Sequence, residues 1–187
     1  NFFLTDGEEA QIVVLEETPR VFMGHVVKVK FGKSKVFYVT LQCQKATQSH
    51  CGLCTTNKKN VNSSRQIVCF TVLDSRGRWD SEKSAFDGKA AAKFWLAPLG
   101  AAKAMKRLRD ESDGQLSDKI VKLSKDGKNY TPQIVLNKKG GVMEYRPAPE
   151  YLGELPDFDF LFAPLSDEEL ESILDIDVDE DEGTNTT

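Results

Sequence analysis

Residues 21–43 read VFMGHVVKVKFGKSKVFYVTLQC, and this stretch determines the class of fold. Residues 21–31 alternate apolar side chains with polar or basic ones, which is the period of a strand that buries one face. Gly32 and the basic residues after it supply a turn, and residues 36–43 are strand-like again. We therefore predict a β-hairpin here, within a mainly β protein.

Further short apolar runs predict strands on both sides of this hairpin, at residues 11–16, 66–73, 91–97, 120–124 and 130–137. The last two flank an Asp-Gly pair that favours a tight turn. Residues 99–111 form the one convincing helix, with Leu99, Ala102, Met105 and Leu108 on one stripe. About seven strands, one helix and an irregular polar stretch are typical of a small barrel or partly open sandwich rather than a βαβ fold.

Charge divides the chain into two parts. All 25 Lys and Arg lie within residues 1–146, together with only 15 of the 29 Asp and Glu, and the other 14 carboxylates follow Arg146. A basic body with an acidic tail indicates nucleic-acid binding by a protein that carries its own polyanionic competitor. The alternative is a solvated basic face with a disordered tail that only aids solubility.

A metal-binding pattern overlaps the hairpin. His25, Cys43, Cys51 and Cys54 are spaced H-x17-C-x7-C-x2-C. A CxxC turn can bring two thiolates onto one cation at about 2.3 Å, Cys43 can add a third, and an imidazole on the neighbouring strand can complete a tetrahedron. A Cys₃His set without an open position favours structural Zn²⁺ as the cofactor.

Two other interpretations of these residues stay open. His50 could replace His25 as the histidine ligand, or the CxxC pair could serve redox chemistry, although no βαβ pattern surrounds it. Cys69 lies within an apolar strand, and we expect it to be a small core residue. Because no export signal is evident, the cysteines are expected to be thiols or metal ligands rather than disulfides.

The start of the chain and its hydropathy give two further expectations. No run of about 18 apolar residues is present, so we expect no membrane span. The chain begins with Asn1 rather than Met, and we expect further residues ahead of it.

Several of these segments resemble one family. Residues 21–25 and 36–43, with His50-Cys-Gly-Leu-Cys54, are similar to the zinc-containing, helix-destabilising single-stranded-DNA-binding proteins of tailed bacteriophages. Residues 3–8 and 12–15 look like the family's first core strand, and residues 68–74 look like the strand after its zinc loop. The resemblance implies an OB-type core, a zinc subdomain liganded by the four residues above, and a cytoplasmic location in a bacterial host.

We accordingly predict an OB-like, five-stranded-type barrel over residues 1–146, with a zinc subdomain inserted at about 43–64 and a disordered or partly helical acidic tail over 147–187. The expected function is non-sequence-specific binding of single-stranded DNA in phage replication, recombination and repair. The alternative is a zinc-stabilised transcription or recombination accessory factor that binds polymerase or another protein rather than naked DNA. No catalytic grouping is recognisable, so we do not expect an enzyme.

Binding of single strands requires cations for phosphates and exposed rings for bases. Trp79 lies in a turn-rich stretch and is the best stacking candidate, whereas Phe70 is expected in the core and one of Phe94 and Trp95 is expected to point inward. The predicted DNA-binding residues are Lys28, Lys30, Lys33, Lys35, Phe37, Tyr38, Lys58, Lys59, Arg65, Arg76, Arg78, Trp79, Lys93, Trp95, Lys106, Arg107 and Arg109.

The acidic tail also contains apolar residues. Ser166 and Glu169 form a capping box, which predicts a helix over residues 167–174. Acidic-hydrophobic alternation is typical of segments that dock onto partners, here replication or recombination enzymes, and the tail could also fold back over the basic groove. An inert tail is the alternative. The predicted partner-binding residues are Phe158, Phe160, Phe162, Leu170, Ile173 and Leu174.

Overall fold

The computed structural model describes residues 1–31, 35–46, 49–146, 150–153, 155, 157–163 and 165–174. The protein is mainly β, as predicted, and every strand pair is antiparallel. The chain forms two compact units. The first contains Asn1–Val21 and Ile67–Asp157, and the second contains Phe22–Gln66 and the segment that starts at Phe158. The second unit therefore takes in much more than the insertion expected at 43–64.

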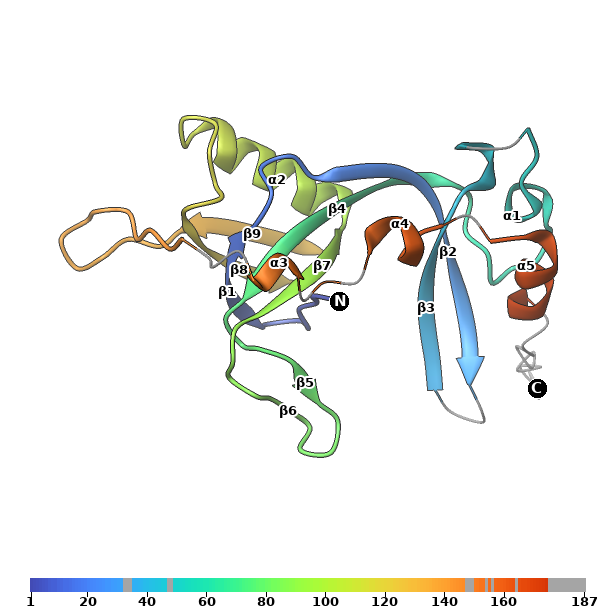
Figure 1. Ribbon diagram of the computed structural model, residues 1–187, viewed down its shortest axis with the longest axis horizontal. Helices are drawn as coiled ribbons and strands as arrows, with labels where there is room; N and C mark the ends of the chain where they lie inside the picture. The colour runs from blue at the N-terminus through green and yellow to red at the C-terminus, as the bar shows by residue number, and fades with distance from the viewer. Residues whose placement is uncertain are drawn as a thin grey trace, which may run out of the picture. The chain divides into compact units, whose positions relative to one another are not determined.

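The first unit is built on a sheet with the strand order β7-β4-β1-β8-β9 (Figure 1). Its strands are β1 (Glu9–Val14), β4 (Arg65–Asp74), β7 (Ala91–Ala97), β8 (Ile120–Asp126) and β9 (Asn129–Ile134). Ile12 of β1 pairs with Asp74 on one side and with Val121 on the other. The turn between β8 and β9 contains Gly127 at φ 57°, which confirms the predicted Asp-Gly hairpin.

The edges of this sheet are not joined. In the described part of the chain β7 pairs with β4 and β9 with β8, and no pairing connects β7 to β9. The sheet is therefore open, and the closed form of the predicted barrel is not observed.

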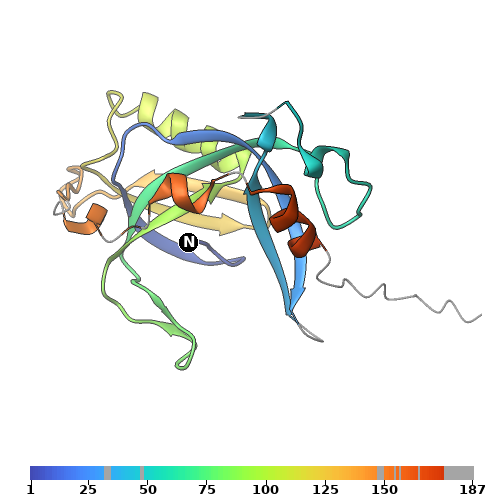
Figure 2. The same ribbon diagram turned by 45° about the vertical axis from the view of Figure 1, so that its right-hand side comes forward.

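The core of the first unit lies between the sheet and α2 (Leu99–Asp110), which Figure 2 shows lying across one face of the strands. Ile12, Val72, Trp95 and Leu123 are buried here, and Met105 fills the space beneath the helix. Alternate positions on each strand contribute, as expected for one buried face. The helix matches its predicted range to within one residue.

Strand β7 is covered on both faces. Phe94 and Trp95 are both buried, although adjacent side chains on a strand point to opposite faces. The N-terminal segment lies along the edge of β7 and helps to cover Trp95, because the N–H of Phe2 donates to the carbonyl of Phe94 at 2.7 Å and the Phe2 ring packs edge-on against Trp95.

A short arm extends from the ends of β4 and β7 and carries β5 (Trp79–Asp80) and β6 (Ala85–Phe86) (Figure 1). The sequence predicts a turn-rich connection here, and neither strand was expected. Gly77 begins the arm at φ 89°, where a Cβ would come within 2.7 Å of the backbone N of Lys89. Only glycine fits this position without local rearrangement. The short helix α3 (Glu150–Gly153) also belongs to this unit.

The second unit is built on the predicted hairpin, formed by β2 (Arg20–Phe31) and β3 (Lys35–Gln42). After it come a 3₁₀ turn, η1 (Gln44–Ala46), and the helix α1 (Gly52–Thr55). Helices α4 (Phe158–Leu161) and α5 (Asp167–Leu174) complete the unit. A small core gathers Val27, Val29 and Leu53 with Leu170 of α5.

Helix α5 starts where the capping box predicts. The backbone N–H of Glu169 donates to the Ser166 hydroxyl at 3.2 Å, and the N–H of Ser166 donates to the Glu169 carboxylate at 2.8 Å. Both orphan donors at the start of the helix are thereby satisfied. No helix in the described ranges is both long enough and apolar enough to cross a membrane.

Candidate metal centre and nucleic-acid interface

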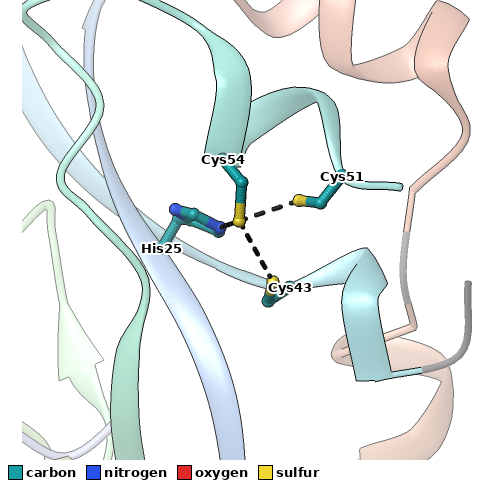
Figure 3. Close-up of side chains that lie close together, drawn as sticks. All are labelled: His25, Cys43, Cys51 and Cys54. Carbon is teal, nitrogen blue, oxygen red and sulfur yellow. Dashed lines mark hydrogen bonds between the residues drawn. The ribbon is translucent and has the colours of Figure 1, made fainter. Parts of the chain in front are cut away.

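Four side chains from three places in the second unit converge on one point (Figure 3). His25 comes from β2, Cys43 follows the last residue of β3, and Cys51 and Cys54 come from the N-cap and third residue of α1. Their ligand atoms all lie within 4.8 Å of one another. His25, Cys43 and Cys51 are buried, and Cys54 is partly buried. The four residues form a candidate metal site.

The spacing of these atoms fits a tetrahedral ion. The sulfurs of Cys43 and Cys54 are 3.6 Å apart, and Nε2 of His25 lies 3.5 Å from the Cys54 sulfur and 3.7 Å from the Cys51 sulfur. Tetrahedral ligands with metal–sulfur bonds near 2.3 Å and metal–nitrogen bonds near 2.0 Å stand about 3.5–3.8 Å from each other. The donor set therefore has the size and the chemistry of a thiophilic site and is consistent with zinc.

The imidazole of His25 is held from its other side. Its Nδ1 lies 2.9 Å from the carbonyl oxygen of Asn62, so Nδ1 carries the proton and donates while Nε2 faces the sulfurs with its lone pair. Asn62 is in turn fixed to β2 because its N–H donates to the Val26 carbonyl at 3.0 Å. These two hydrogen bonds fix the orientation of the imidazole, as the partners of a metal-binding histidine do.

The thiols differ in how readily they ionise. Burial raises the pKa of Cys43 to about 11. Burial also opposes ionisation of Cys51, but backbone N–H groups of Gln44 and Cys54 and the neighbouring thiols donate to its sulfur and lower its pKa. The pKa of Cys51 therefore lies below that of Cys43, and binding at Cys43 must displace a proton.

The two remaining candidates lie elsewhere. His50 is exposed and does not belong to the cluster, so His25 is the histidine that the fold brings to the cysteines. Cys69 is buried in β4, and burial raises its pKa to about 12. This confirms that Cys69 is a core residue.

The β2–β3 hairpin carries exposed rings on both of its faces, because the adjacent residues Phe37 and Tyr38 project to opposite sides of β3. Tyr38 is 71 % exposed, and the adjacent Phe37 is about half exposed. Lys28, which is partly exposed, pairs across the strands with Tyr38. Lys58, Lys59 and Arg65 of the same unit are also exposed. Position 33 lies outside the described residues, as do the side chains of Lys30 and Lys35.

The arm of the first unit carries a second group of rings. Trp79 is 49 % exposed and packs edge-on against Phe86 with the ring centroids 5.1 Å apart, and Phe3 lies beside Phe86 at 6.2 Å. Arg78 next to Trp79 is exposed. These rings leave an indole face on the surface, which agrees with the placement of Trp79 as a candidate for stacking.

Three residues predicted to bind DNA have structural roles instead. Trp95 is 2 % exposed in the core, so no base can reach its ring. Arg76 and Lys93 both bind the buried carboxylate of Asp74, at 3.0 Å and 2.7 Å from its Oδ2. Arg76 also pairs with Glu8. The prediction for Trp95 is wrong because its ring is enclosed in the core. Arg76 and Lys93 are instead held by Asp74, because a buried carboxylate requires paired cations.

The Asp74 network also shapes the arm. Burial acts to raise the pKa of Asp74, but hydrogen bonds from Arg76 and Lys93 outweigh it and lower the pKa. Arg76 lies over the ring of Phe86 at 4.2 Å and Lys93 lies over it at 4.8 Å. Sequence reasoning missed Asp74. The available signal was a lone carboxylate at the end of an otherwise apolar strand.

The basic residues of α2 remain on the surface. Lys106 and Arg107 are exposed and Arg109 is partly exposed. Lys106 pairs with Asp110 at 2.8 Å, an exposed contact of the kind that contributes little to stability. A groove of about 240 Å³ runs beside this helix, lined by Val68, Phe70 and Met105 among others.

The predicted partner-binding residues of the tail are divided between buried and exposed positions. Phe162 and Leu170 are buried within the second unit, Phe158 and Ile173 are partly buried, and Phe160 is 81 % exposed. The side chain of Leu174 lies outside the described part of the structure. Among the residues of the tail whose side chains the structure describes, only Phe160 and the neighbouring Leu161 offer a large exposed apolar surface.

Comparisons of the chain with protein-family models, with curated proteins and with solved structures found no match.

Proposed function

We propose that this protein binds single-stranded DNA without sequence preference, that a structural zinc ion stabilises it, and that it is not an enzyme. The observation that carries the proposal is the exposed ring of Tyr38 beside Lys28 on the β2–β3 hairpin. A sequence-tolerant site combines a ring on which a base can stack with a cation that reaches the adjacent phosphate.

The position of these rings argues against a purely structural role. A tyrosine that served the core of the hairpin would be buried, as Val27 and Val29 are on the opposite face. Phe37, on the other face of the hairpin, and Trp79, on the arm of the first unit, provide further exposed rings. Stacking contributes about 1–3 kcal/mol per base and does not depend on which base is present.

Charge supports the same class of ligand. Residues 1–146 carry ten more basic than acidic side chains, and Lys58, Lys59 and Arg65 lie exposed in the unit that bears Tyr38. Neutralised phosphates release counterions, so such binding weakens steeply as salt is added.

Zinc is the proposed ion because three sulfurs and one imidazole nitrogen complete a tetrahedron and leave no open position for catalysis. Within this proposal the ion fixes the hairpin that bears Tyr38. The same proposal includes four further points: a relation to the phage family, an OB-type origin of the open sheet, a role in replication, recombination and repair, and a location in the host cytoplasm. The resemblance of segments within residues 21–54 supports them.

The test is a salt titration of binding to fluorescein-labelled oligo-dT, followed by anisotropy. Log affinity should fall linearly with log salt, with a slope of about −0.7 for each neutralised phosphate. Lys28→Ala should reduce the magnitude of the slope by about 0.7, whereas Lys122→Ala should leave it unchanged because Lys122 pairs with Glu9 at 2.8 Å. Binding that is indifferent to salt would remove the proposal.

The tail is proposed to compete with DNA. Residues 175–187 hold six of the carboxylates and follow α5 in the sequence, so a chain that ends at residue 174 keeps every helix and strand of the second unit that the structure describes. We expect this truncated chain to bind oligo-dT more tightly at low salt and equally at high salt. Equal affinity at all salt concentrations would contradict self-competition.

An alternative function is favoured by Phe160, whose exposed ring follows two acidic residues, Asp157 and Asp159. In this alternative the protein is an accessory factor that binds polymerase or another protein and leaves DNA alone. Such an adaptor would show negligible affinity for oligo-dT at about 50 mM salt, where counterion release still favours a genuine single-strand binder.

A further inference from the structure

The acidic segment 158–174 packs in the same compact unit as the candidate metal site. We propose that the face of the metal unit formed by Val27, Val29 and Leu53 is a docking site for an acidic amphipathic helix. The helix that occupies it is this chain's own segment 166–174, and the bound metal keeps the site formed. This inference goes beyond DNA binding and does not depend on it.

Helix α5 has the two faces that such docking requires. Leu170 is 3 % exposed and Ile173 is partly buried, and this i,i+3 pair belongs to the core cluster that also contains Leu53 of α1, Cys43 and Cys51. Glu168 and Glu169 are exposed. One face is therefore apolar and packed into the core that holds metal ligands, and the other is acidic and exposed.

Gln44 joins the segment to the metal site. Its side chain is fully enclosed, its Nε2 donates to the carbonyl of Leu165 at 2.7 Å, and its Oε1 accepts from the N–H of Gly52 at 3.0 Å. Gln44 directly follows the ligand Cys43, and Gly52 directly follows the ligand Cys51. The side-chain amide of Gln44 therefore links the turns that carry Cys43 and Cys51 to Leu165, which lies just ahead of α5.

The metal is what fixes these two turns relative to each other. Helix α1 has four residues, and its N-cap Cys51 makes no side-chain capping bond. Such a short helix has little stability of its own, so ligation of Cys43 and Cys51 to one ion must hold the turns in register. Loss of the ion would leave both hydrogen-bond partners of Gln44 unfixed. It would also loosen the core cluster in which Leu170 packs.

A second anchor lies at the other end of the segment. Phe158 and Phe162 stack with each other at 4.6 Å and contact Phe22 at 5.9 and 5.2 Å. Phe22 lies on β2, the strand that also carries the ligand His25, although the two side chains project to opposite faces of that strand. One end of the segment is thus attached next to the ligands Cys43 and Cys51, and the other end is attached to the strand that bears His25.

Coupling of this kind is reciprocal. If the metal favours docking of the segment, the docked segment must retain the metal by the same factor. A protein partner that takes the apolar face of α5 then has to displace it from the metal unit, and it meets the exposed Phe160 and Leu161 first.

The test uses the full chain, loaded with one zinc ion or stripped by a chelator, and measures amide hydrogen exchange of residues 167–174. Exchange should be at least tenfold faster in the stripped protein. Gln44→Ala should speed exchange of the zinc-loaded segment several-fold, whereas Gln42→Ala, at the end of β3, should not. Equal exchange in loaded and stripped protein, or no effect of Gln44→Ala, would overturn the proposal.

A second variant covers the case in which Gln44→Ala does not fold. Leu170→Asp removes the apolar contact from the far side, and transfer of zinc to a chromogenic chelator should become several-fold faster. Phe160→Ala, in the same segment but exposed, is the matched control and should release zinc at the wild-type rate. Identical release from Leu170→Asp and wild type would also overturn the proposal. The inference rests on the zinc site of the proposed function but not on DNA binding. None of these measurements involves DNA, so their failure is distinguishable from a failure of the proposed DNA binding.

Discussion

Lys28 and Tyr38 face each other across the β2–β3 hairpin, directly paired in the register of the two strands. The lysine is partly exposed and the ring is largely exposed. Side chains of directly paired residues project to the same face of a sheet. An unpaired base that stacks on Tyr38 would therefore bring its phosphate within reach of Lys28.

Removal of the ring should weaken binding. Tyr38→Ala eliminates one stacking platform, and we expect the affinity for oligo-dT to fall between about fivefold and about a hundredfold. Tyr38→Phe keeps the ring and should bind almost as wild type does. Both are measured by anisotropy at one salt concentration. An alanine variant that binds as tightly as the phenylalanine variant would exclude stacking at this position.

The two tryptophans should respond differently to DNA. Trp79 is about half exposed on the arm, whereas Trp95 is enclosed by Phe2, Phe70 and Tyr130. Saturating oligo-dT should quench the tryptophan emission of wild type, and the quenching should disappear in Trp79→Phe, whose only indole is Trp95. Quenching that persists in this variant would mean that the core tryptophan is perturbed.

Asp74 should stabilise the first unit in a pH-dependent manner. Asp74→Asn leaves Arg76 and Lys93 with a neutral partner, and loss of a buried charge partner costs about 3–5 kcal/mol of unfolding free energy. Hydrogen bonds lower the pKa of Asp74 in the fold, so its contribution is present above the unfolded pKa of about 3.9 and is lost as pH falls toward the lower folded value.

Urea unfolding followed by Trp95 fluorescence measures this effect. The difference between wild type and Asp74→Asn should be large at pH 7 and should shrink as the pH is taken below about 4. A difference that stays constant, or grows, at acidic pH would show that the carboxylate does not act through its charge.

The metal site should bind one zinc ion per chain. His25→Ala and Cys54→Ser each remove a ligand and should lower the affinity by several orders of magnitude, whereas Cys69→Ala should retain full stoichiometry because Cys69 lies outside the cluster. Since the pKa of Cys43 is about 11 without metal, binding displaces a proton and the affinity should fall as the pH is lowered. Competition with a chromogenic chelator at pH 6, 7 and 8 gives both results.

Much of the fold was predictable because the signals were local. The hairpin, the Asp-Gly turn, helix α2 and the capping box of α5 each follow from a few neighbouring residues, and the structure confirms them. The CxxC pair limits its two cysteines to one site, and the fold then brings His25 rather than His50 to it.

The wrong predictions depended on contacts between residues far apart in the sequence. Near Arg76 the only signal is a carboxylate at the end of an apolar strand, and it does not establish that Asp74 is buried, because burial is set by the pairing of β4 with β1 and β7. Trp95 is covered in part by Phe2, which lies 93 positions earlier in the chain. The open edges of the sheet likewise result from which strands pair, and a list of strands does not determine that.

The most direct measurement of the central proposal is a competition between two unlabelled DNAs of equal length for protein bound to labelled oligo-dT. One competitor is a single strand of mixed sequence, and the other is the same sequence as a duplex. The exposed rings of Tyr38 and Trp79 require bases that are not already stacked in pairs. We therefore expect the single strand to displace the label at a concentration at least tenfold lower than the duplex. Equal displacement by the two competitors, or stronger displacement by the duplex, would contradict the account.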